Sequence, residues 1–334
     1  MSTPKPKIAL FVGGTSPERD VSKDTGRATY EALKFLKYPT VVIDPGLGTN
    51  QPADVEKIFD KDFSGVISNR NCIDAVNSKL LDDVDLVFLA LHGKFAEDGT
   101  MQALLELRDK KYTGSGVLAS SMGMDKNISK ILFENAGVHT AKWFVVDGNR
   151  INTNEINNRI KNEFGFPCII KPNDQGSTVG LTLLKNLDET EKAIKLALQF
   201  SSKALIEQYI AGRELTVAIL DSEPLPVLEI VPKGGLYDYQ AKYTKGMSEY
   251  LVPADIPEKI FKETQLQAKK AYDVLCCKDY ARVDFRLSEK NEIYCLEVNT
   301  LPGMTATSLV PKMAKAVGIS FEQLIEKIIQ LALR

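Results

Sequence analysis

Short apolar runs alternate with glycine-bearing turns and amphipathic stretches along the first third of the chain. Residues 7–12 (K-I-A-L-F-V) have the continuous apolar character of a buried strand, and a turn over 13–18 leads into an expected helix from Val21 to Leu36. A strand over 40–43 follows, and then a second unit with a strand over 84–91, a turn over 92–99 and a helix over about 101–107. This alternation of strand, loop and helix predicts a Rossmann-like parallel sheet with ligand loops at the strand ends.

The middle of the chain predicts a smaller unit. A helix over 126–136 opens it, and an apolar strand over 166–172 precedes a glycine-bearing turn at 175–180. A helix over about 188–200 and a strand over 204–209 complete the unit. The chain length favours two or three domains, and we expect three, over 1–120, 121–210 and 211–334.

The last third contains a predicted hairpin that gathers oxygen ligands on one face. Residues 281–286 (A-R-V-D-F-R) and 293–299 (I-Y-C-L-E-V-N) alternate like strands. If they pair around a turn at 288–291, Arg282 lies opposite Glu297, Asp284 lies diagonally from Glu297, and Asn299 is two residues further along. A slip of one residue in the pairing would turn the polar side chains of one strand to the opposite face of the hairpin. Oxygen ligands without His or Cys suit Mg²⁺. Ordinary cross-strand ion pairs explain the same residues, so the hairpin alone does not decide between a metal site and ion pairs.

Two further segments stand out in this part of the chain. Residues 237–250 are expected to form a long polar loop, too rich in tyrosine and lysine for a simple linker. An amphipathic helix is expected from Ser320 to the end.

Composition narrows the function classes. The 334 residues include 42 basic and 44 acidic side chains, a balance that gives no reason to expect nucleic acid or a membrane surface as partner. Small molecules are the expected ligands. Five cysteines without C-x-x-C spacing argue against disulfides and zinc and are expected to be buried small hydrophobes, and two histidines exclude multi-histidine metal motifs. The absence of a secretory or membrane-spanning run predicts a cytoplasmic protein.

Several features of the sequence, each weak alone, together indicate a nucleotide-binding site. Lys171 ends an apolar strand before the glycine-bearing turn, where backbone amides can hold phosphate, although a lysine at a strand end is more often simply solvated. Glu207 to Ile210, with Glu214, offer carboxylates for ribose and apolar walls for a base, although a strand joining two domains has the same residues. Together with the acidic hairpin, these parts are those needed to hold Mg-ATP between two domains.

Runs of sequence along the whole chain are similar to one enzyme family. They are G-G-T-S-P-E-R-D-V-S at 13–22, A-L-H-G-x-x-x-E-D-G at 90–99, Y-T-G-S-G-V at 112–117, M-D-K at 124–126, I-K-P at 170–172, G-S-T-V-G at 176–180, Y-D-Y-Q-A-K-Y at 237–243 and E-V-N-T-L-P-G-M-T at 297–305. The chain resembles the D-alanine:D-alanine ligases of the ATP-grasp superfamily. Ala96, where the family usually has glycine, and Gln208, at a position often basic, are the departures.

The resemblance implies a fold and a reaction. The fold is α/β and α+β: an ATP-grasp fold with an N-terminal Rossmann-like, substrate-binding parallel-sheet domain over 1–120, a central ATP-grasp domain over 121–210, and a C-terminal ATP-grasp domain over 211–334 with the metal site and closing loop. ATP would phosphorylate one D-alanine, and the amine of a second would attack the acyl phosphate, which gives D-alanyl-D-alanine for peptidoglycan precursors. The family is commonly dimeric, so we expect a homodimer.

The resemblance also assigns roles by position. ATP would be bound by Lys126, Lys171, Gly176, Ser177, Thr178, Glu207, Gln208, Tyr209, Ile210, Glu214 and Lys242. Mg²⁺, with two ions expected and Mn²⁺ a possible substitute, would be bound by Asp284, Glu297 and Asn299. The substrates would contact Glu18, His92, Arg282, Gly303, Ser308 and Leu309. Catalysis would involve Glu18, Ser177, Tyr243, Arg282 and Gly303, with Lys242 and Tyr243 closing over the site and Tyr243 linked to Ser177.

Other interpretations stay open from the residues alone. His92 is also explained as a helix-capping histidine, Glu18 as a first-turn carboxylate, and Tyr239 and Tyr243 as surface packing. A related ATP-grasp enzyme that makes a D-alanyl ester or another amide is the second functional candidate. A nucleotide-binding regulator without turnover is the third, and a nicotinamide oxidoreductase is weaker because the glycine fingerprint is absent.

Overall fold

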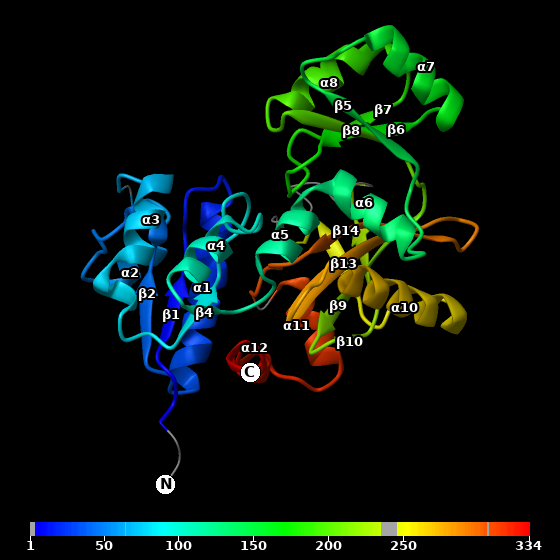
Figure 1. Ribbon diagram of the computed structural model, residues 1–334. Helices are drawn as coiled ribbons and strands as arrows, with labels where there is room; N and C mark the ends of the chain where they lie inside the picture. Colours follow the sequence, from blue (N-terminus) through cyan, green and yellow to red (C-terminus); the bar gives the residue numbers. More distant parts are fainter. Residues whose placement is uncertain (1–3, 64, 235–245, 306) are drawn as a thin grey trace.

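Over its described residues, the chain folds around three sheets, each with its own covering helices (Figure 1). The computed structural model describes residues 4–63, 65–234, 246–305 and 307–334. In Figure 1 the N-terminal residues, drawn in blue, form the lobe on the left, the green residues form the lobe at the upper right, and the yellow and orange residues form the lobe at the lower right. None of the described helices is both long and apolar enough to cross a membrane.

The first sheet is parallel, as the sequence predicts. Its strand order is β2-β1-β3-β4, with β1 (Ile8–Phe11), β2 (Thr40–Ile43), β3 (Leu86–Leu89) and β4 (Lys111–Tyr112). The associated helices are α1 (Arg19–Phe35), α2 (Val55–Phe59), α3 (Asn69–Asn77) and α4 (Thr100–Leu107), with short 3₁₀ turns at Pro45–Leu47 and Lys79–Leu81. Because β1 and β3 are adjacent and parallel, the turns that follow them, 13–18 and 92–99, meet at the same edge of the sheet.

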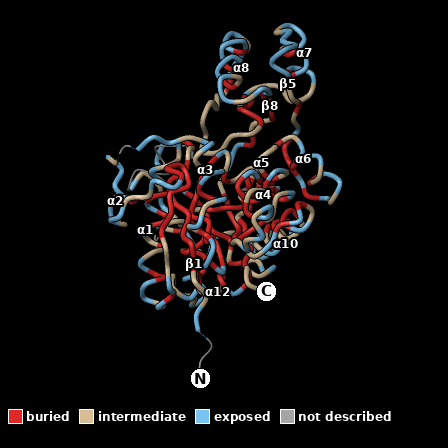
Figure 2. The backbone as a smooth tube through the Cα atoms, turned by 60° about the vertical axis from the view of Figure 1, so that its left-hand side comes forward, coloured by how far each residue is buried: buried red, intermediate tan, exposed pale blue. Residues whose placement is uncertain are grey.

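The second sheet is antiparallel and has the order β5-β8-β6-β7. Its strands are β5 (Trp143–Asp147), β6 (Cys168–Pro172), β7 (Thr182–Leu184) and β8 (Lys203–Gln208), and its helices are α7 (Thr153–Glu163) and α8 (Thr190–Leu198), the latter after a 3₁₀ turn at Leu187–Glu189. Apolar side chains of α7 and α8 pack on one face of this sheet and form a core of their own. Figure 2 shows this unit as a separate lobe whose helices are exposed on their outer sides.

The third sheet is also antiparallel, in the order β12-β11-β9-β13-β14, with β10 paired to β9. Its strands are β9 (Arg213–Leu220), β10 (Glu223–Pro224), β11 (Leu228–Pro232), β12 (Ser248–Leu251), β13 (Tyr280–Leu287) and β14 (Ile293–Asn299). Helices α5 (Val117–Met124), α6 (Lys126–Asn135) and α10 (Glu258–Val274) contribute to the core on one face, and α11 (Leu309–Ala316) to the core on the other. Alternate residues of β9 therefore belong to different cores.

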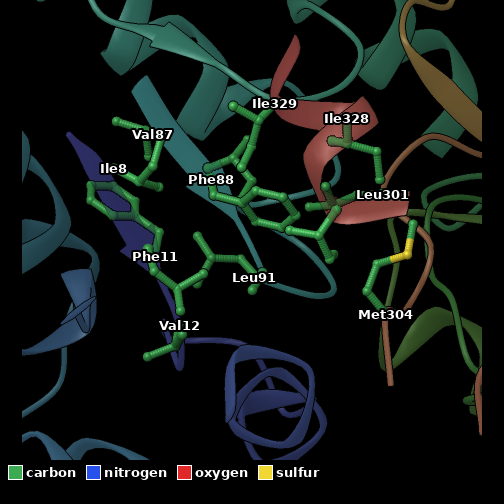
Figure 3. Packing of buried hydrophobic residues seen from close by; sticks show 14 of the residues in the cluster. Ile8, Phe11, Val12, Val87, Phe88, Leu91, Leu301, Met304, Ile328 and Ile329 are labelled. Carbon is green, nitrogen blue, oxygen red and sulfur yellow. The ribbon is translucent and has the colours of Figure 1, made fainter. Parts of the chain in front are cut away.

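The last helix, α12 (Phe321–Leu333), packs against the first sheet. A capping box at Ser320 and Gln323 starts it. Figure 3 shows Ile328 and Ile329 beside Phe88 of β3, in the same cluster as Leu301. The first sheet is therefore covered in part by the end of the chain. The three domain ranges expected from the sequence stay a prediction.

The structure corrects two predictions made from the sequence. The expected loop over 237–250 ends earlier, because residues 248–251 form β12 and pair with β11. Of the five cysteines, four are buried as expected, and Cys276 is exposed.

Candidate active site

A cavity of about 580 Å³ lies where the turns of the first sheet meet the second and third sheets. Polar side chains from all three units line it. The predicted site residues among its lining are Glu18, His92, Lys126, Gly176, Ser177, Arg282, Glu297, Asn299, Gly303, Ser308 and Leu309. The structure thus brings together residues that are up to 291 positions apart in the sequence, between Glu18 and Leu309.

The turn that carries Glu18 is held by hydrogen bonds to its neighbours. Gly13 N–H donates to Ser22 Oγ at 2.7 Å, and Ser22 Oγ donates to the carbonyl of Ala90 at 2.7 Å. Gly13 has φ +74°, and a Cβ there would lie 2.4 Å from Asp44 Oδ2, so only glycine fits. This network fixes the end of β1 against the end of β3 and places Glu18 at the start of α1.

Glu18 and Ser177 are in direct contact. Ser177 Oγ donates a hydrogen bond to Glu18 Oε1 and so joins the N-terminal turn to the glycine-bearing turn after β6. Ser177 and Thr178 have φ values of +51° and +63°, a left-handed conformation that is uncommon for residues with a side chain. Strained backbone of this kind is often found at functional sites.

His92 begins the turn after β3 and is buried against α1. Its Nε2 lies 2.9 Å from Thr25 Oγ1, and its Nδ1 lies 3.3 Å from Glu97 Oε1. A Cβ on Gly303 would come within 3.9 Å of His92 Nε2, so the Gly303 backbone lies against the imidazole ring. Ala96 is buried in the same turn and has no positive φ, so its backbone does not require the glycine that the family usually has there.

Lys126 begins α6 and reaches two groups of the site. Its Nζ donates to the carbonyl of Gln175 at 2.7 Å and lies 3.0 Å from Glu297 Oε2. Its backbone N–H donates to the carbonyl of Asn173. The start of α6 is therefore tied both to the glycine-bearing turn and to β14.

Lys171 contacts the carboxylate of Glu207, a residue expected on the adenosine side. Lys171 Nζ lies 2.5 Å from Glu207 Oε1. Lys130 Nζ lies 3.1 Å from Glu207 Oε2, and the Lys130 side chain is fully buried. Burial alone raises the pKa of the Glu207 carboxyl, but the charges of Lys171 and Lys130 outweigh it and lower that pKa below its usual range. Lys130 was not among the predicted site residues, although it lies four residues after Lys126 and therefore on the same face of α6.

The segment from Glu207 to Ile210, which continues past the end of β8, is held by Arg286 of β13, a residue that was not predicted to belong to the site. Arg286 Nε donates to the carbonyl of Ile210 at 3.1 Å, and Nη2 donates to that of Gly212 at 2.7 Å. Arg286 Nη1 also contacts Glu214 Oε2 at 3.3 Å. Its guanidinium lies 5.9 Å from the centroid of the Tyr209 ring. One buried arginine thus fixes the connection between the second and third sheets.

Gln208 ends β8 opposite Cys168 of β6. Its backbone N–H donates to the carbonyl of Lys142 at 2.9 Å. The residue therefore belongs to the sheet rather than to a loose hinge.

The predicted register of the hairpin is wrong by two residues. Arg282 pairs with Asn299 and Asp284 with Glu297, rather than Arg282 with Glu297. The loop between β13 and β14 is one residue longer than expected, and a β-bulge at Leu296 adds one more. Two single-residue shifts sum to an even number, so the four polar residues remain on one face.

The proposed metal ligands sit beside basic groups. Arg282 Nε and Nη2 donate to the two carboxylate oxygens of Asp284 at 2.9 and 2.8 Å, and Thr216 Oγ1 donates to Asp284 Oδ1 at 2.6 Å. Over the described ranges, no group of three or more His, Cys, Asp or Glu side chains is arranged around one point. Two paired carboxylates with one carboxamide still fit Mg²⁺, which takes one or two carboxylates and fills its shell with phosphate oxygens and water.

Ser308 and Leu309 form the start of α11 at the edge of the cavity. Ser308 Oγ accepts a hydrogen bond from Thr305 N–H at 3.0 Å and lies 2.8 Å from Thr305 Oγ1. A Cβ on Gly303 would lie 3.3 Å from Ser308 Oγ. The start of a helix with a positive dipole end therefore lies next to the Gly303 backbone.

Lys242 and Tyr243, and with them Tyr239, lie outside the residues that the structure describes.

Comparison with known proteins identifies the family. Residues 7–115 match the family model described as D-ala D-ala ligase N-terminus, and residues 132–330 match D-ala D-ala ligase C-terminus. The chain belongs to the D-alanine–D-alanine ligase family. One member, from Syntrophotalea carbinolica, is 41% identical over 97% of the chain and 95% of its own length. Another, from Halalkalibacterium halodurans, is 40% identical over 98% of the chain and 99% of its own length.

Solved ligase structures agree with this assignment. The D-alanine–D-alanine ligase of Bacillus anthracis complexed with ATP is 32% identical, with a TM-score of 0.79 and 98% of each chain covered. The VanG D-Ala:D-Ser ligase of Enterococcus faecalis is 31% identical, with a TM-score of 0.81, over 98% of this chain and 99% of its own. The family, the fold class and the class of enzyme predicted from the sequence of this ligase are thereby confirmed.

Proposed function

We propose that this D-alanine–D-alanine ligase works through an acyl phosphate formed and consumed in the cavity described above. The activity is that of the family: ATP-dependent ligation of two D-alanine molecules to D-alanyl-D-alanine, for peptidoglycan precursors. The observation that carries the mechanism is the shared cavity, because Glu18, Lys126, Arg282 and Ser308 all line it. Groups for an ammonium, for phosphates, for an oxyanion and for a carboxylate therefore lie around one space.

ATP would bind between the second and third sheets. Lys126, Lys171 and the amides of Gly176, Ser177 and Thr178 would contact the phosphates, since cations and a turn of backbone N–H groups are suited to anions. Adenosine would lie along residues 207–210, with Glu214 at the ribose. The position of Arg286 supports this, because it contacts both the Ile210 carbonyl at the end of that segment and the Glu214 carboxylate.

Asp284, Glu297 and Asn299 would hold magnesium, with two ions proposed and Mn²⁺ as a possible substitute. Asp284 and Glu297 are cross-strand partners, and Asn299 lies two residues beyond Glu297 on the same face. When bound, the metal would neutralise charge on the transferring phosphoryl group. Lys126 supports Glu297 from the side of the glycine-bearing turn.

The first D-alanine would lie near the N-terminal turns. Glu18 would bind its ammonium, and His92 would lie near its carboxylate. Arg282 and the Gly303 amide would stabilise the oxyanion of the tetrahedral intermediate formed when the second amine attacks. The close approach of the Gly303 backbone to His92 supports a single binding place for that carboxyl group.

The second substrate would place its carboxylate at the start of α11, on Ser308 and Leu309, where the helix dipole favours an anion. Lys242 and Tyr243 would close over the bound substrates and exclude water, which would otherwise hydrolyse the acyl phosphate. We also propose that the protein is cytoplasmic and a homodimer, and that residues 1–120, 121–210 and 211–334 are its three domains.

A release assay for inorganic phosphate tests the proposal. We expect phosphate release from Mg-ATP to depend on D-alanine and to yield one dipeptide for each phosphate. Release without dipeptide would contradict the acyl transfer to an amine. A D-alanyl-D-lactate or D-alanyl-D-serine product, detected by mass spectrometry with D-lactate or D-serine present, would instead identify a ligase with another second substrate. The VanG D-Ala:D-Ser ligase of Enterococcus faecalis is one such enzyme.

A further inference from the structure

Two lysines share one buried carboxylate, and they are held very differently. Lys130 Nζ lies within 3.2 Å of three oxygens: Thr140 Oγ1 at 2.6 Å, Glu207 Oε2 at 3.1 Å and the carbonyl of Ala141 at 3.2 Å. Lys171 Nζ contacts one oxygen among the described residues, Glu207 Oε1. Lys130 is therefore fixed by three groups, whereas one contact holds Lys171.

Burial separates the two lysines as well. The Lys130 side chain is fully buried, with its ammonium 5.2 Å from the centroid of the Trp143 ring, while 11% of the Lys171 side chain is exposed. Thr140 Oγ1 accepts from Lys130 and donates to the carbonyl of Cys295, so both ends of its hydroxyl are engaged. Lys130 thus has no route to a ligand, and Lys171 is the lysine that can turn toward one.

We propose that Lys130 is a positioning residue: it is the permanent counter-ion of Glu207 and so lets Lys171 leave that carboxylate to bind the phosphates of ATP. The inference rests on the proposed function, in which Lys171 is a phosphate ligand. A buried carboxylate that loses its partner charge is strongly destabilised. With Lys130 in place, Glu207 keeps one ion pair when Lys171 moves, and without Lys130 it keeps none.

Charge alone supports the same division of roles. Glu207 carries one negative charge between two lysines, so the cluster has one positive charge in excess. Burial lowers the pKa of the Lys130 ammonium, and the facing Glu207 carboxylate opposes that effect. The excess charge is available to the nucleotide only through Lys171, because Lys130 is inaccessible.

The test compares a nucleotide with phosphates and one without. Lys130→Met should raise the Kd of the full-length protein for Mg-ATP, measured by titration calorimetry without D-alanine, by about tenfold or more. Adenosine does not require Lys171 to move, so its Kd, measured by competition, should change by no more than about twofold. Equal weakening of both ligands would overturn the proposal and assign Lys130 a purely structural role, and an unchanged Kd for Mg-ATP would also overturn it.

Thr140→Val is the matched control. It removes one hydrogen bond of Lys130, together with the bond from Thr140 to the Cys295 carbonyl, but leaves every charge in place. We expect a lower Tm with the Mg-ATP Kd within about threefold of wild type. If Thr140→Val also weakened Mg-ATP binding selectively, the loss would be caused by altered packing around Lys130, and the counter-ion role would be wrong.

A second pair of variants serves if Lys130→Met does not fold. Glu207→Gln and the double variant Lys130→Met/Glu207→Gln both have a neutral amide that needs no counter-ion, so their Kd values for Mg-ATP should agree within about threefold. A gap of tenfold or more would overturn the proposal. Failure of the wild-type protein to bind Mg-ATP at all would instead contradict the proposed function, so the two failures are distinguishable.

Discussion

Ser177 Oγ donates a hydrogen bond to Glu18 Oε1, across 159 positions of sequence, and this bond is a direct side-chain link between the N-terminal turn and the glycine-bearing turn. A hydrogen bond to a charged group contributes about 1.5–3 kcal/mol. Glu18 is therefore oriented by a residue of the proposed phosphate loop. The proposed binding places of the first D-alanine and of ATP are therefore linked by this contact.

The first prediction follows from that link. Ser177→Ala should lower kcat/KM for D-alanine by about tenfold to a hundredfold, because Glu18 loses the donor that orients it. Ser177→Gly is the control, since it removes the same hydroxyl and suits the φ of +51° better. Equal losses in steady-state assays would assign the effect to the hydroxyl, and wild-type kinetics for Ser177→Ala would show that the bond is not used.

The second prediction concerns the proposed metal ligands. Glu297→Gln should abolish turnover and leave the circular dichroism spectrum and Tm close to wild type, because a neutral amide cannot offset phosphate charge through a cation. Glu292→Gln, exposed just before β14, is the matched control and should keep normal turnover. Near-normal activity of Glu297→Gln at saturating Mg²⁺ would remove Glu297 from the metal site.

The third prediction separates chemistry from nucleotide binding. Arg282→Ala should reduce dipeptide formation by about two orders of magnitude or more, the scale of losing one oxyanion donor. The Kd for Mg-ATP should change much less, and it provides the internal control. The assigned role would be wrong if the variant lost nucleotide affinity and kept its turnover at saturating ATP.

The fourth prediction concerns Tyr243, which lies outside the described residues. Tyr243→His should shift the products from dipeptide toward D-alanyl-D-lactate. An imidazole with a pKa of about 6.5 is partly cationic near neutral pH, so it repels the ammonium of D-alanine and attracts the lactate anion. The shift should therefore be largest at about pH 6 and decline as the pH rises through the imidazole pKa. The ester-to-amide ratio across pH, with both acceptors at equal concentration, measures it, and an unchanged ratio contradicts this account.

The fifth prediction concerns the packing behind the N-terminal turn. A Cβ on Gly26 of α1 would lie 2.2 Å from Val12 Cγ1, at the end of β1. Gly26→Ala should therefore lower the unfolding free energy by about 1–3 kcal/mol through overpacking, despite the better helix propensity of alanine. Thermal or urea unfolding measures the change. Adding Val12→Ala should recover part of the loss, and a Gly26→Ala variant more stable than wild type would contradict the close approach.

The parallel sheet was predictable because its signals are local. Apolar runs such as residues 7–12 end directly at glycine turns, and the structure places β1, β2 and β3 within two residues of the expected ranges. The short edge strand β4 was not predicted. Helix α10 was not predicted: its buried face combines apolar residues such as Tyr272 with the polar residues Thr264 and Gln267, which interrupt the apolar positions. The hairpin register failed for another reason. The residues around Leu296 do not indicate a bulge, because a bulge depends on how the strand pairs with its partner.

The site residues that lie within sequence motifs were predictable, and those that act through contacts with other residues were not. The residues of the cavity come from runs that resemble the family, so their grouping could be expected. Lys130 and Arg286 act on other residues from positions buried in the fold, and only the geometry connects them to Glu207 and Ile210. Burial of a charged residue is visible in three dimensions and has no signature in a single sequence.

The packing of α12 on the first sheet has a consequence for the order in which the protein is built on the ribosome. Strands β1 to β4 emerge about 200 residues before α12 does. Translation proceeds at roughly 5–20 residues per second. The apolar surface around Phe88 therefore stays exposed for on the order of ten to forty seconds before Ile328 and Ile329 are synthesised and can pack on it. A nascent chain in which α12 has not yet been synthesised therefore exposes part of the N-terminal core, and in that interval a chaperone has a surface to bind.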